Sequence, residues 1–372
     1  MAGIYLHIPF CKQACHYCDF HFSTSLRYRE RMVEALLWEL ELRHDYLAGQ
    51  TIETIYFGGG TPSLLPAADI ERLLNAIGER FSVAEGAEIT LEANPDDLTE
   101  ARLAELAASP VNRLSIGLQS FDAEDLRFFN RAHSAEEAAR CLELALRHGF
   151  ADLSVDLIYG SPTTSDATWH DNLQRILDYR VPHLSCYCLT VEPNTALGKF
   201  VRNGTARPVE EEQAARQFEY LLEWCEATGY EQYEISNFAR DERYSRHNTA
   251  YWLGKHYLGI GPSAHSFDGV SRSWNVSNNA LYMKHLENGG PYRETEHLSA
   301  TERYNEYLMT ALRTRWGVDL QRIRTMGFEE QFLRDSQAFL QRGHLERHAD
   351  LYRLTGSGKL LADGIAAQLF AV

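Results

Sequence analysis

The sequence predicts an α/β fold: a partial (β/α)6 TIM-like barrel followed by a mostly helical, winged-helix-like C-terminal domain. Three observations lead to this prediction. Strand-like and helix-like segments alternate through residue 189, as in parallel βα units. From Leu298 onward, apolar residues recur at helical spacing. The 372-residue chain is 44% hydrophobic, so it has enough apolar surface for a substantial core.

The barrel elements follow from short apolar runs and from the amphipathic stretches between them. The predicted strands are Gly3–Ile8, Ile52–Phe57, Glu88–Glu92, Arg113–Gly117, Leu153–Tyr159 and His183–Leu189. The predicted helices between them are Arg27–Tyr46, Ala67–Arg80, Leu103–Ala107, Ala135–His148 and Trp169–Leu177. Because helices separate the strands, we expect the strands to run parallel.

The second half of the chain has a different pattern. A helix is predicted at Arg216–Thr228 and an edge strand at Tyr230–Ile235. Asn237–Asn279 is rich in Gly, Ser, Asn and aromatic residues, which predicts irregular loops. The C-terminal pattern predicts two helices, a hairpin and a last helix, at Arg303–Thr314, Glu329–Gln341, Leu345–Leu354 and Leu360–Leu369. We therefore expect three domains, residues 1–200, 201–295 and 296–372.

Charge and composition exclude several classes of protein. Lys and Arg total 36 and Asp and Glu total 52, which gives a formal net charge of −16. This acidic balance argues against nucleic-acid binding, so we expect the winged-helix-like region to have a structural or protein-contact role. No apolar run approaches the roughly 20 residues of a membrane-spanning helix. The segment Met1–Pro9 lacks the basic start of a secretory signal.

Three of the seven cysteines form a cluster directly after the first predicted strand. Cys11, Cys15 and Cys18 have the spacing C-x3-C-x2-C, and Tyr17 precedes the last of them. Three thiolates without an obvious fourth ligand suit a [4Fe–4S] cluster whose open iron can chelate S-adenosylmethionine. The alternative is a zinc knuckle whose fourth ligand is His16, His21 or a residue distant in the sequence. The other four cysteines are expected to pack in the core.

Further polar and glycine residues stand where the barrel strands end. Gly58-Gly59-Gly60-Thr61 follows the second strand, Glu92 ends the third and Gln119 follows the fourth. Asp156 lies within the apolar fifth strand, where an unpaired carboxylate would be costly. The carboxyl ends of parallel barrel strands meet on one face, so these residues can share a pocket. Tight turns and hydrogen bonds to nearby loops are the alternative explanation.

The cysteine spacing resembles the radical S-adenosylmethionine superfamily. The strings Gly-Gly-Gly-Thr-Pro, Ser-Ile-Gly-Leu-Gln-Ser-Phe and Asp-Leu-Ile-Tyr-Gly are similar to the group around oxygen-independent coproporphyrinogen III dehydrogenase. The resemblance implies S-adenosylmethionine contacts at Tyr5, Gly59, Gly60, Thr61, Glu92, Gln119, Arg131 and Asp156. Tyr17 stands where phenylalanine is common in the dehydrogenase, and its ring can still stack near the adenine. A solvated position on a helix is the alternative for Arg131.

Two features favour the haem chaperone branch of this group over the dehydrogenase itself. The dehydrogenase has a substantial extension before its cluster, whereas Cys11 lies almost at the start of this sequence. The segment from His247 to Trp252 reads His-Asn-x-x-Tyr-Trp, which resembles a signature of that branch. A neutral imidazole is an ordinary axial ligand of haem iron, so His247 is the expected haem ligand and His265 a second candidate. The alternative is a loop histidine within an aromatic cluster.

The resemblance implies a haem chaperone that binds haem, a [4Fe–4S] cluster and S-adenosylmethionine, with no catalytic residue assigned. It delivers haem to membrane haem proteins such as respiratory enzymes, and a homodimer is expected. Clustered cysteines indicate a reducing cytoplasm, with contact at the membrane during delivery. The alternative is oxidative decarboxylation of coproporphyrinogen III to protoporphyrinogen IX, and a radical enzyme acting on another substrate is a third reading.

Overall fold

The structure is a computed structural model that describes residues 2–372, and a twelve-stranded sheet forms its main body. The sheet order is β12-β11-β10-β9-β1-β2-β3-β4-β5-β6-β8-β7. From β9 through β1 to β6, neighbouring strands pair in parallel. The six central strands are β1 (Ala2–Ile8), β2 (Ile52–Gly59), β3 (Val83–Ala93), β4 (Arg113–Gln119), β5 (Leu153–Tyr159) and β6 (His183–Cys188). The predicted series of parallel βα units is confirmed.

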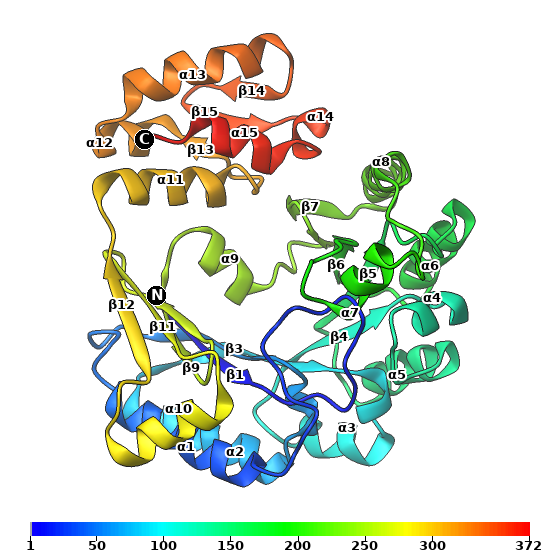
Figure 1. Ribbon diagram of the computed structural model, residues 1–372, viewed down its shortest axis with the longest axis vertical. Helices are drawn as coiled ribbons and strands as arrows, with labels where there is room; N and C mark the ends of the chain where they lie inside the picture. Colours follow the sequence, from blue (N-terminus) through cyan, green and yellow to red (C-terminus); the bar gives the residue numbers. More distant parts are fainter. Residues whose placement is uncertain (1) are drawn as a thin grey trace.

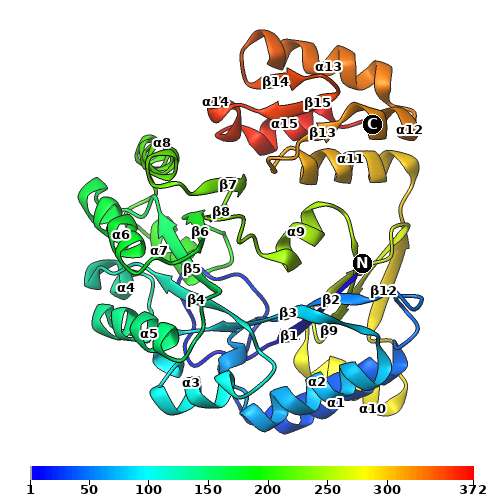
Figure 2. The ribbon, with the colours of Figure 1, turned by 180° about the vertical axis from the view of Figure 1, so that it is seen from behind.

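The sheet curves into an open arch with helices on its outer face (Figures 1 and 2). These helices are α1 (Arg29–Leu42), α2 (Ala67–Arg80), α3 (Glu100–Ala107), α4 (Ala123–Phe128), α5 (Ala135–Arg147) and α6 (Asp166–Asp178). Their apolar sides bury fully enclosed residues such as Leu36, Leu73 and Leu142 against the strands. We call the space on the inner face of the arch the lumen.

The segment after β6 extends the sheet and also enters the lumen. It contains α7 (Ala196–Arg202), α8 (Glu211–Thr228), β7 (Glu231–Glu234), β8 (Asn237–Ala239) and α9 (Arg246–Trp252). It continues with β9 (His256–Ile260), β10 (His265–Phe267), β11 (Ser271–Asn275), α10 (Asn279–Asn288) and β12 (Arg293–His297). Helix α9 lies inside the arch in both views (Figures 1 and 2).

The prediction of irregular loops over Asn237–Asn279 is therefore wrong. The strands here are three to five residues long, too short to produce a clear apolar alternation. They form because β8 pairs with β6 and β9 pairs with β1, and both partners are distant in sequence. The proposed division of the chain at residues 200 and 295 stays a prediction.

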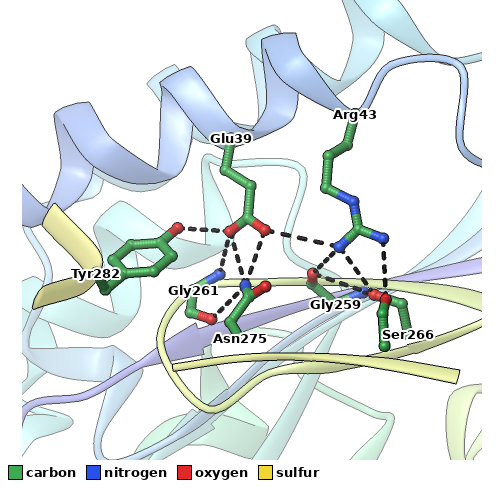
Figure 3. A network of polar contacts seen from close by, with 8 residues as sticks. Glu39, Arg43, Gly259, Gly261, Ser266, Asn275 and Tyr282 are labelled. Carbon is green, nitrogen blue, oxygen red and sulfur yellow. Dashed lines mark hydrogen bonds and ion pairs between the residues drawn. The ribbon is translucent and has the colours of Figure 1, made fainter. Parts of the chain in front are cut away.

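A buried ion pair fastens β9–β11 and α10 to α1 (Figure 3). Glu39 lies in the last turn of α1 and Arg43 directly follows the helix, and they are 0% and 2% exposed. The Glu39 carboxylate accepts hydrogen bonds from the backbone of Gly261 and from the side chains of Asn275 and Tyr282. Arg43 donates to the carbonyl oxygen of Gly259 and to Ser266 Oγ. Several hydrogen bonds thus compensate the loss of hydration of both charges.

The C-terminal residues form a separate core above the open side of the arch (Figure 1). Its elements are α11 (Ala300–Ala311), β13 (Val318–Asp319), α12 (Leu320–Met326), α13 (Glu329–Gln341), β14 (Leu345–His348), β15 (Leu351–Leu354), α14 (Gly356–Lys359) and α15 (Ala362–Leu369). The strands form a small antiparallel sheet in the order β13-β15-β14. The predicted helical domain with a hairpin is confirmed. Across residues 2–372, every helix falls short of the length and apolar character needed to cross a membrane.

Candidate functional site

The three clustered cysteines lie in a loop, residues 9–28, that connects β1 to α1 at the carboxyl end of the strands. We call it the cysteine loop. All three thiols are partly buried and free. Thr61 Oγ1 lies 3.6 Å from Cys11 Sγ, and Arg131 donates to Cys15 Sγ at 3.3 Å. Residues far apart in sequence therefore converge on two of the three sulfurs.

Asn94 connects these two contacts, and the sequence did not single it out. Its Nδ2 donates to Thr61 Oγ1 at 3.1 Å, and its Oδ1 accepts from Arg131. Arg131 also donates to the carbonyl oxygen of Gly117 at 2.6 Å. Asn94 comes two residues after Glu92, directly after the end of β3, and its extended backbone continues the alternation of the strand. That spacing was the available signal.

Burial raises the pKa of two of the three thiols. It raises the pKa of Cys11 to about 11, and it raises the pKa of Cys18 to about 11 as well. Both thiols are therefore protonated at neutral pH without a metal. Iron binding requires thiolates, so a metal must displace these protons. At Cys11, the hydrogen bond from Thr61 and the positive charge of Arg131 both lower the thiol pKa and so oppose part of the effect of burial.

The glycines at the end of β2 and directly after it allow a close approach of backbone segments. Gly59 has φ of +107°, and a Cβ on it would lie 2.5 Å from His7 Nδ1. A Cβ on Gly60 would lie 2.6 Å from the carbonyl oxygen of Phe10. A side chain at either position would displace the start of the cysteine loop or the ring beneath it. The glycines are therefore required for this packing, whatever ligand the loop holds.

Two buried carboxylates in the lumen, Glu92 and Asp156, lie close enough to repel each other. Glu92 accepts from Tyr56 Oη at 2.8 Å and from the Gly59 backbone N–H at 3.1 Å. Burial raises the pKa of Glu92 to about 7, and repulsion from Asp156 adds to this effect. Burial also raises the pKa of Asp156 to about 6, against the opposing effects of Ser185 and nearby arginines. Both groups can therefore change charge near neutral pH.

The remaining predicted contacts lie around the same end of the lumen. Gln119 is 8% exposed at the end of β4 and has φ of +69°, which is unusual for a residue other than glycine. Tyr17 packs edge-on against Phe129, with ring centroids 5.6 Å apart. Tyr5 stacks on Tyr56 at 6.1 Å. The structure thus gathers these residues near the cysteine loop.

His247 lies deeper in the lumen, on α9. Its Nδ1 shares a hydrogen bond of 2.8 Å with Thr54 Oγ1, and its ring stacks on Tyr56 with centroids 5.0 Å apart. Within residues 2–372, its Nε2 has no hydrogen-bond partner. Burial, followed by repulsion from Arg113, lowers the pKa of His247 to about 3. The imidazole is therefore neutral with one nitrogen free. By contrast, His265 is exposed on β10.

The cysteines outside the loop are mostly buried, and the described side chains around the site do not converge on a single metal ion. Of the four other cysteines, Cys141, Cys186 and Cys225 are buried as expected, whereas Cys188 is exposed at the end of β6. Within residues 2–372, no group of three or more His, Cys, Asp or Glu side chains converges as donors for a single metal ion. Each thiolate of an iron–sulfur cluster binds a different iron, so a cluster needs no such point of convergence. The three cysteine thiols, in a loop packed closely against Gly59 and Gly60, fit a cluster of this kind.

Comparison with curated proteins identifies the family. The heme chaperone HemW of Mycobacterium tuberculosis is 36% identical over 99% of this chain and 94% of its own length. The chain belongs to the HemW family. HemW of Escherichia coli is 34% identical over 98% of this chain and 96% of its own length. A mitochondrial mouse relative, radical S-adenosyl methionine domain-containing protein 1, is 38% identical over 71% of this chain and 60% of its own length.

Two family models match parts of the chain, and one solved structure has a similar fold. Residues 5–176 match the radical SAM superfamily, and residues 298–361 match the HemN C-terminal domain. Coproporphyrinogen III oxidase (HemN) from Escherichia coli, a radical SAM enzyme, has a TM-score of 0.86 and 24% identity. It covers 100% of this chain and 90% of that chain. This likeness confirms the predicted fold class. Membership of the superfamily implies a [4Fe–4S] cluster and S-adenosylmethionine.

Proposed function

We propose that this protein is a haem chaperone whose haem ligand is His247. The observation that carries the proposal is the state of that side chain. Its imidazole is held neutral by burial, its Nδ1 is bonded to Thr54, and its Nε2 is free in the lumen. A metal-binding histidine typically has this arrangement, with the second ring nitrogen hydrogen-bonded to a partner. Tyr56 and Tyr5 supply apolar ring faces nearby, which suits a porphyrin.

The cysteine loop would hold the resident cofactors. Cys11, Cys15 and Cys18 would ligate a [4Fe–4S] cluster, which supplies electron transfer and an open iron for S-adenosylmethionine when bound. Thr61 and Arg131 favour the thiolate form of Cys11, and Arg131 also donates a hydrogen bond to Cys15 Sγ. The proposed S-adenosylmethionine contacts are Tyr5, Tyr17, Gly59, Gly60, Thr61, Glu92, Gln119, Arg131 and Asp156.

The proposed partners follow from the function. A haem chaperone hands its cargo to apoproteins, and we propose membrane haem proteins such as respiratory enzymes as acceptors. Delivery would take place from the cytoplasm at the membrane surface, and the protein would work as a homodimer. The acidic net charge of −16 favours protein contacts over nucleic acid.

The test compares haem binding by the wild type, His247→Ala and His265→Ala proteins, each with a reconstituted cluster under anaerobic conditions. Haem is titrated and followed by its absorption. Loss of the axial ligand should weaken binding of His247→Ala by at least about 100-fold, the upper end for loss of a ligand's partner. His265→Ala should bind haem as the wild type does, because His265 lies on β10 and its side chain is exposed.

The same preparations are incubated with S-adenosylmethionine, a reductant and coproporphyrinogen III. The chaperone proposal expects no protoporphyrinogen. Catalytic formation of that product would restore the dehydrogenase reading. Unchanged haem affinity of His247→Ala would remove the ligand assignment.

A further inference from the structure

Three neighbouring strands carry a row of inward-facing residues beneath His247. Gly3 of β1 pairs with Thr54 of β2, and Thr54 pairs with Glu88 of β3. Residues paired across parallel strands point to the same face of the sheet, so the three positions face the lumen together. Thr54 is 3% exposed and Glu88 is 5% exposed. We call these three residues the histidine seat.

Each residue of the histidine seat meets a different part of His247. Thr54 Oγ1 bonds to ring atom Nδ1 at 2.8 Å. Glu88 fixes the backbone: its Oε1 accepts from the N–H of His247 at 2.9 Å, and its Oε2 accepts from the N–H of Arg246 at 2.8 Å. Gly3 leaves the room that the ring occupies, because a Cβ there would lie 2.7 Å from Thr54 Oγ1 and 3.3 Å from the ring.

We propose that Gly3, Thr54 and Glu88 are positioning residues that hold His247 as a haem ligand, with Thr54 Oγ1 accepting the Nδ1 proton. This inference rests on the proposed function. The tautomer is the central point, because an imidazole binds iron through a nitrogen that carries no proton. A proton placed on Nδ1 by an acceptor leaves the lone pair of Nε2 directed into the lumen.

Glu88 supports the same geometry from the backbone. Helix α9 is short, and its first backbone N–H groups have no partner within the helix. The Glu88 carboxylate satisfies two of these groups and ties the start of α9 to β3. The buried guanidinium of Arg113 lies close enough for mutual attraction with this carboxylate. The start of α9 is therefore attached to the wall of the barrel rather than to a mobile loop.

The experiment measures the haem affinity of Thr54→Val, Thr54→Ser and Gly3→Ala proteins, with the spectrum of the bound haem recorded for each. Thr54→Val keeps the shape but removes the hydroxyl, so affinity should fall by about 10- to 100-fold, as for other lost partners of metal-bound histidines. Thr54→Ser keeps the hydroxyl and should stay close to the wild type. Gly3→Ala should weaken binding and alter the haem spectrum, since its methyl group displaces the ring.

Thr90→Val is the matched control. Thr90 is also buried on β3, two residues from Glu88, and its hydroxyl has no hydrogen-bond partner in residues 2–372. It should retain wild-type affinity and spectrum. Iron and sulfide content of every variant shows whether the barrel has folded around its cluster.

The outcomes separate this inference from the proposed function. If His247→Ala loses haem but Thr54→Val and Gly3→Ala bind as the wild type does, the histidine seat has no positioning role. Tighter binding by Thr54→Val would also overturn the inference, because Thr54 would then be donating to Nδ1 and holding the wrong tautomer. If His247→Ala binds normally, the ligand assignment itself fails.

Discussion

The two ends of the lumen are built on different principles. The histidine seat stands on paired strands, and its contacts with His247 are complete without any ligand. The cysteine loop has little regular structure, and its partly buried thiols at Cys11 and Cys18 are protonated at neutral pH without a metal. One end is therefore preformed, while the other depends on its cofactor for its final charge state.

Because of this difference, we expect haem binding and cluster assembly to have different free-energy costs. If His247 is the haem ligand as proposed, haem would meet a neutral imidazole that is already oriented, and little ordering would be required. Assembly of the proposed cluster would have to deprotonate the thiols of Cys11 and Cys18, which would couple it to pH. Tyr56 touches both ends, because its ring stacks on His247 and its hydroxyl donates to Glu92.

The largest expected effect comes from the cysteine loop. Replacing Cys15 by Ala removes one of three proposed cluster ligands and leaves Arg131 without its sulfur partner. The reconstituted variant should lack the cluster almost completely, as measured by its iron and sulfide content. Its haem affinity should stay within about 3-fold of the wild type, since the preformed end is untouched. The exposed Cys188 provides the control, and Cys188→Ala should assemble a normal cluster. A joint loss of cluster and haem would show that the ends are not independent.

A change of pH should distinguish the ends next. Burial and then repulsion from Arg113 lower the pKa of His247 to about 3, so the ring stays neutral from pH 8 to pH 5. A histidine with an ordinary pKa of about 6.5 would lose its neutral form about 30-fold at pH 5. Haem titrations at the two pH values should therefore differ by less than about 2-fold. A 30-fold weakening at pH 5 would contradict this expectation.

At the other end, S-adenosylmethionine binding should respond to the same pH change. Burial raises the pKa of Glu92 to about 7, so the carboxylate is ionised above that value and gains a proton below it. The ligand carries positive charges, which favours the ionised form. Its affinity should therefore fall as the pH drops below 7, and Glu92→Gln should leave only the weaker dependence that Asp156, with its pKa raised to about 6, contributes at lower pH.

The smallest effect is expected from Tyr56→Phe, which tests the connection between the ends. The change removes the hydrogen bond to Glu92 but keeps the ring that stacks on His247. S-adenosylmethionine affinity should fall by about 2- to 10-fold, as for loss of one ordinary hydrogen bond. Haem affinity should remain unchanged in a parallel titration. A larger effect on haem than on S-adenosylmethionine would reverse the roles given to the hydroxyl and the ring.

Much of the fold was predictable because local pattern and tertiary structure agree. The strand Leu153–Tyr159 has the predicted bounds, and the helix Ala67–Arg80 does as well. These elements have apolar runs or clear helical periodicity. The cysteine loop could be singled out from the sequence because its three cysteines lie within eight residues of one another, and their role as cluster ligands stays a prediction.

The histidine seat was not predictable for a physical reason. Gly3, Thr54 and Glu88 are ordinary strand residues, and none of them has an unusual neighbour in sequence. Only the register of β1, β2 and β3 aligns them, and only the return of the chain through α9 brings His247 onto them. Register depends on the whole sheet, so a single sequence does not reveal which residues share a row.

The path of residues 240–255 has a mechanical consequence. This segment connects β8 to β9. Because β8 pairs with β6 and β9 pairs with β1, the segment runs directly from one side of the parallel arch to the other, and we call it the chord. The buried Glu39–Arg43 network anchors the β9 end (Figure 3). Spreading the arch would stretch this chord and pull α9 away from β2 and β3. The fixed length of residues 240–255 thus links the width of the barrel to the position of the His247 imidazole.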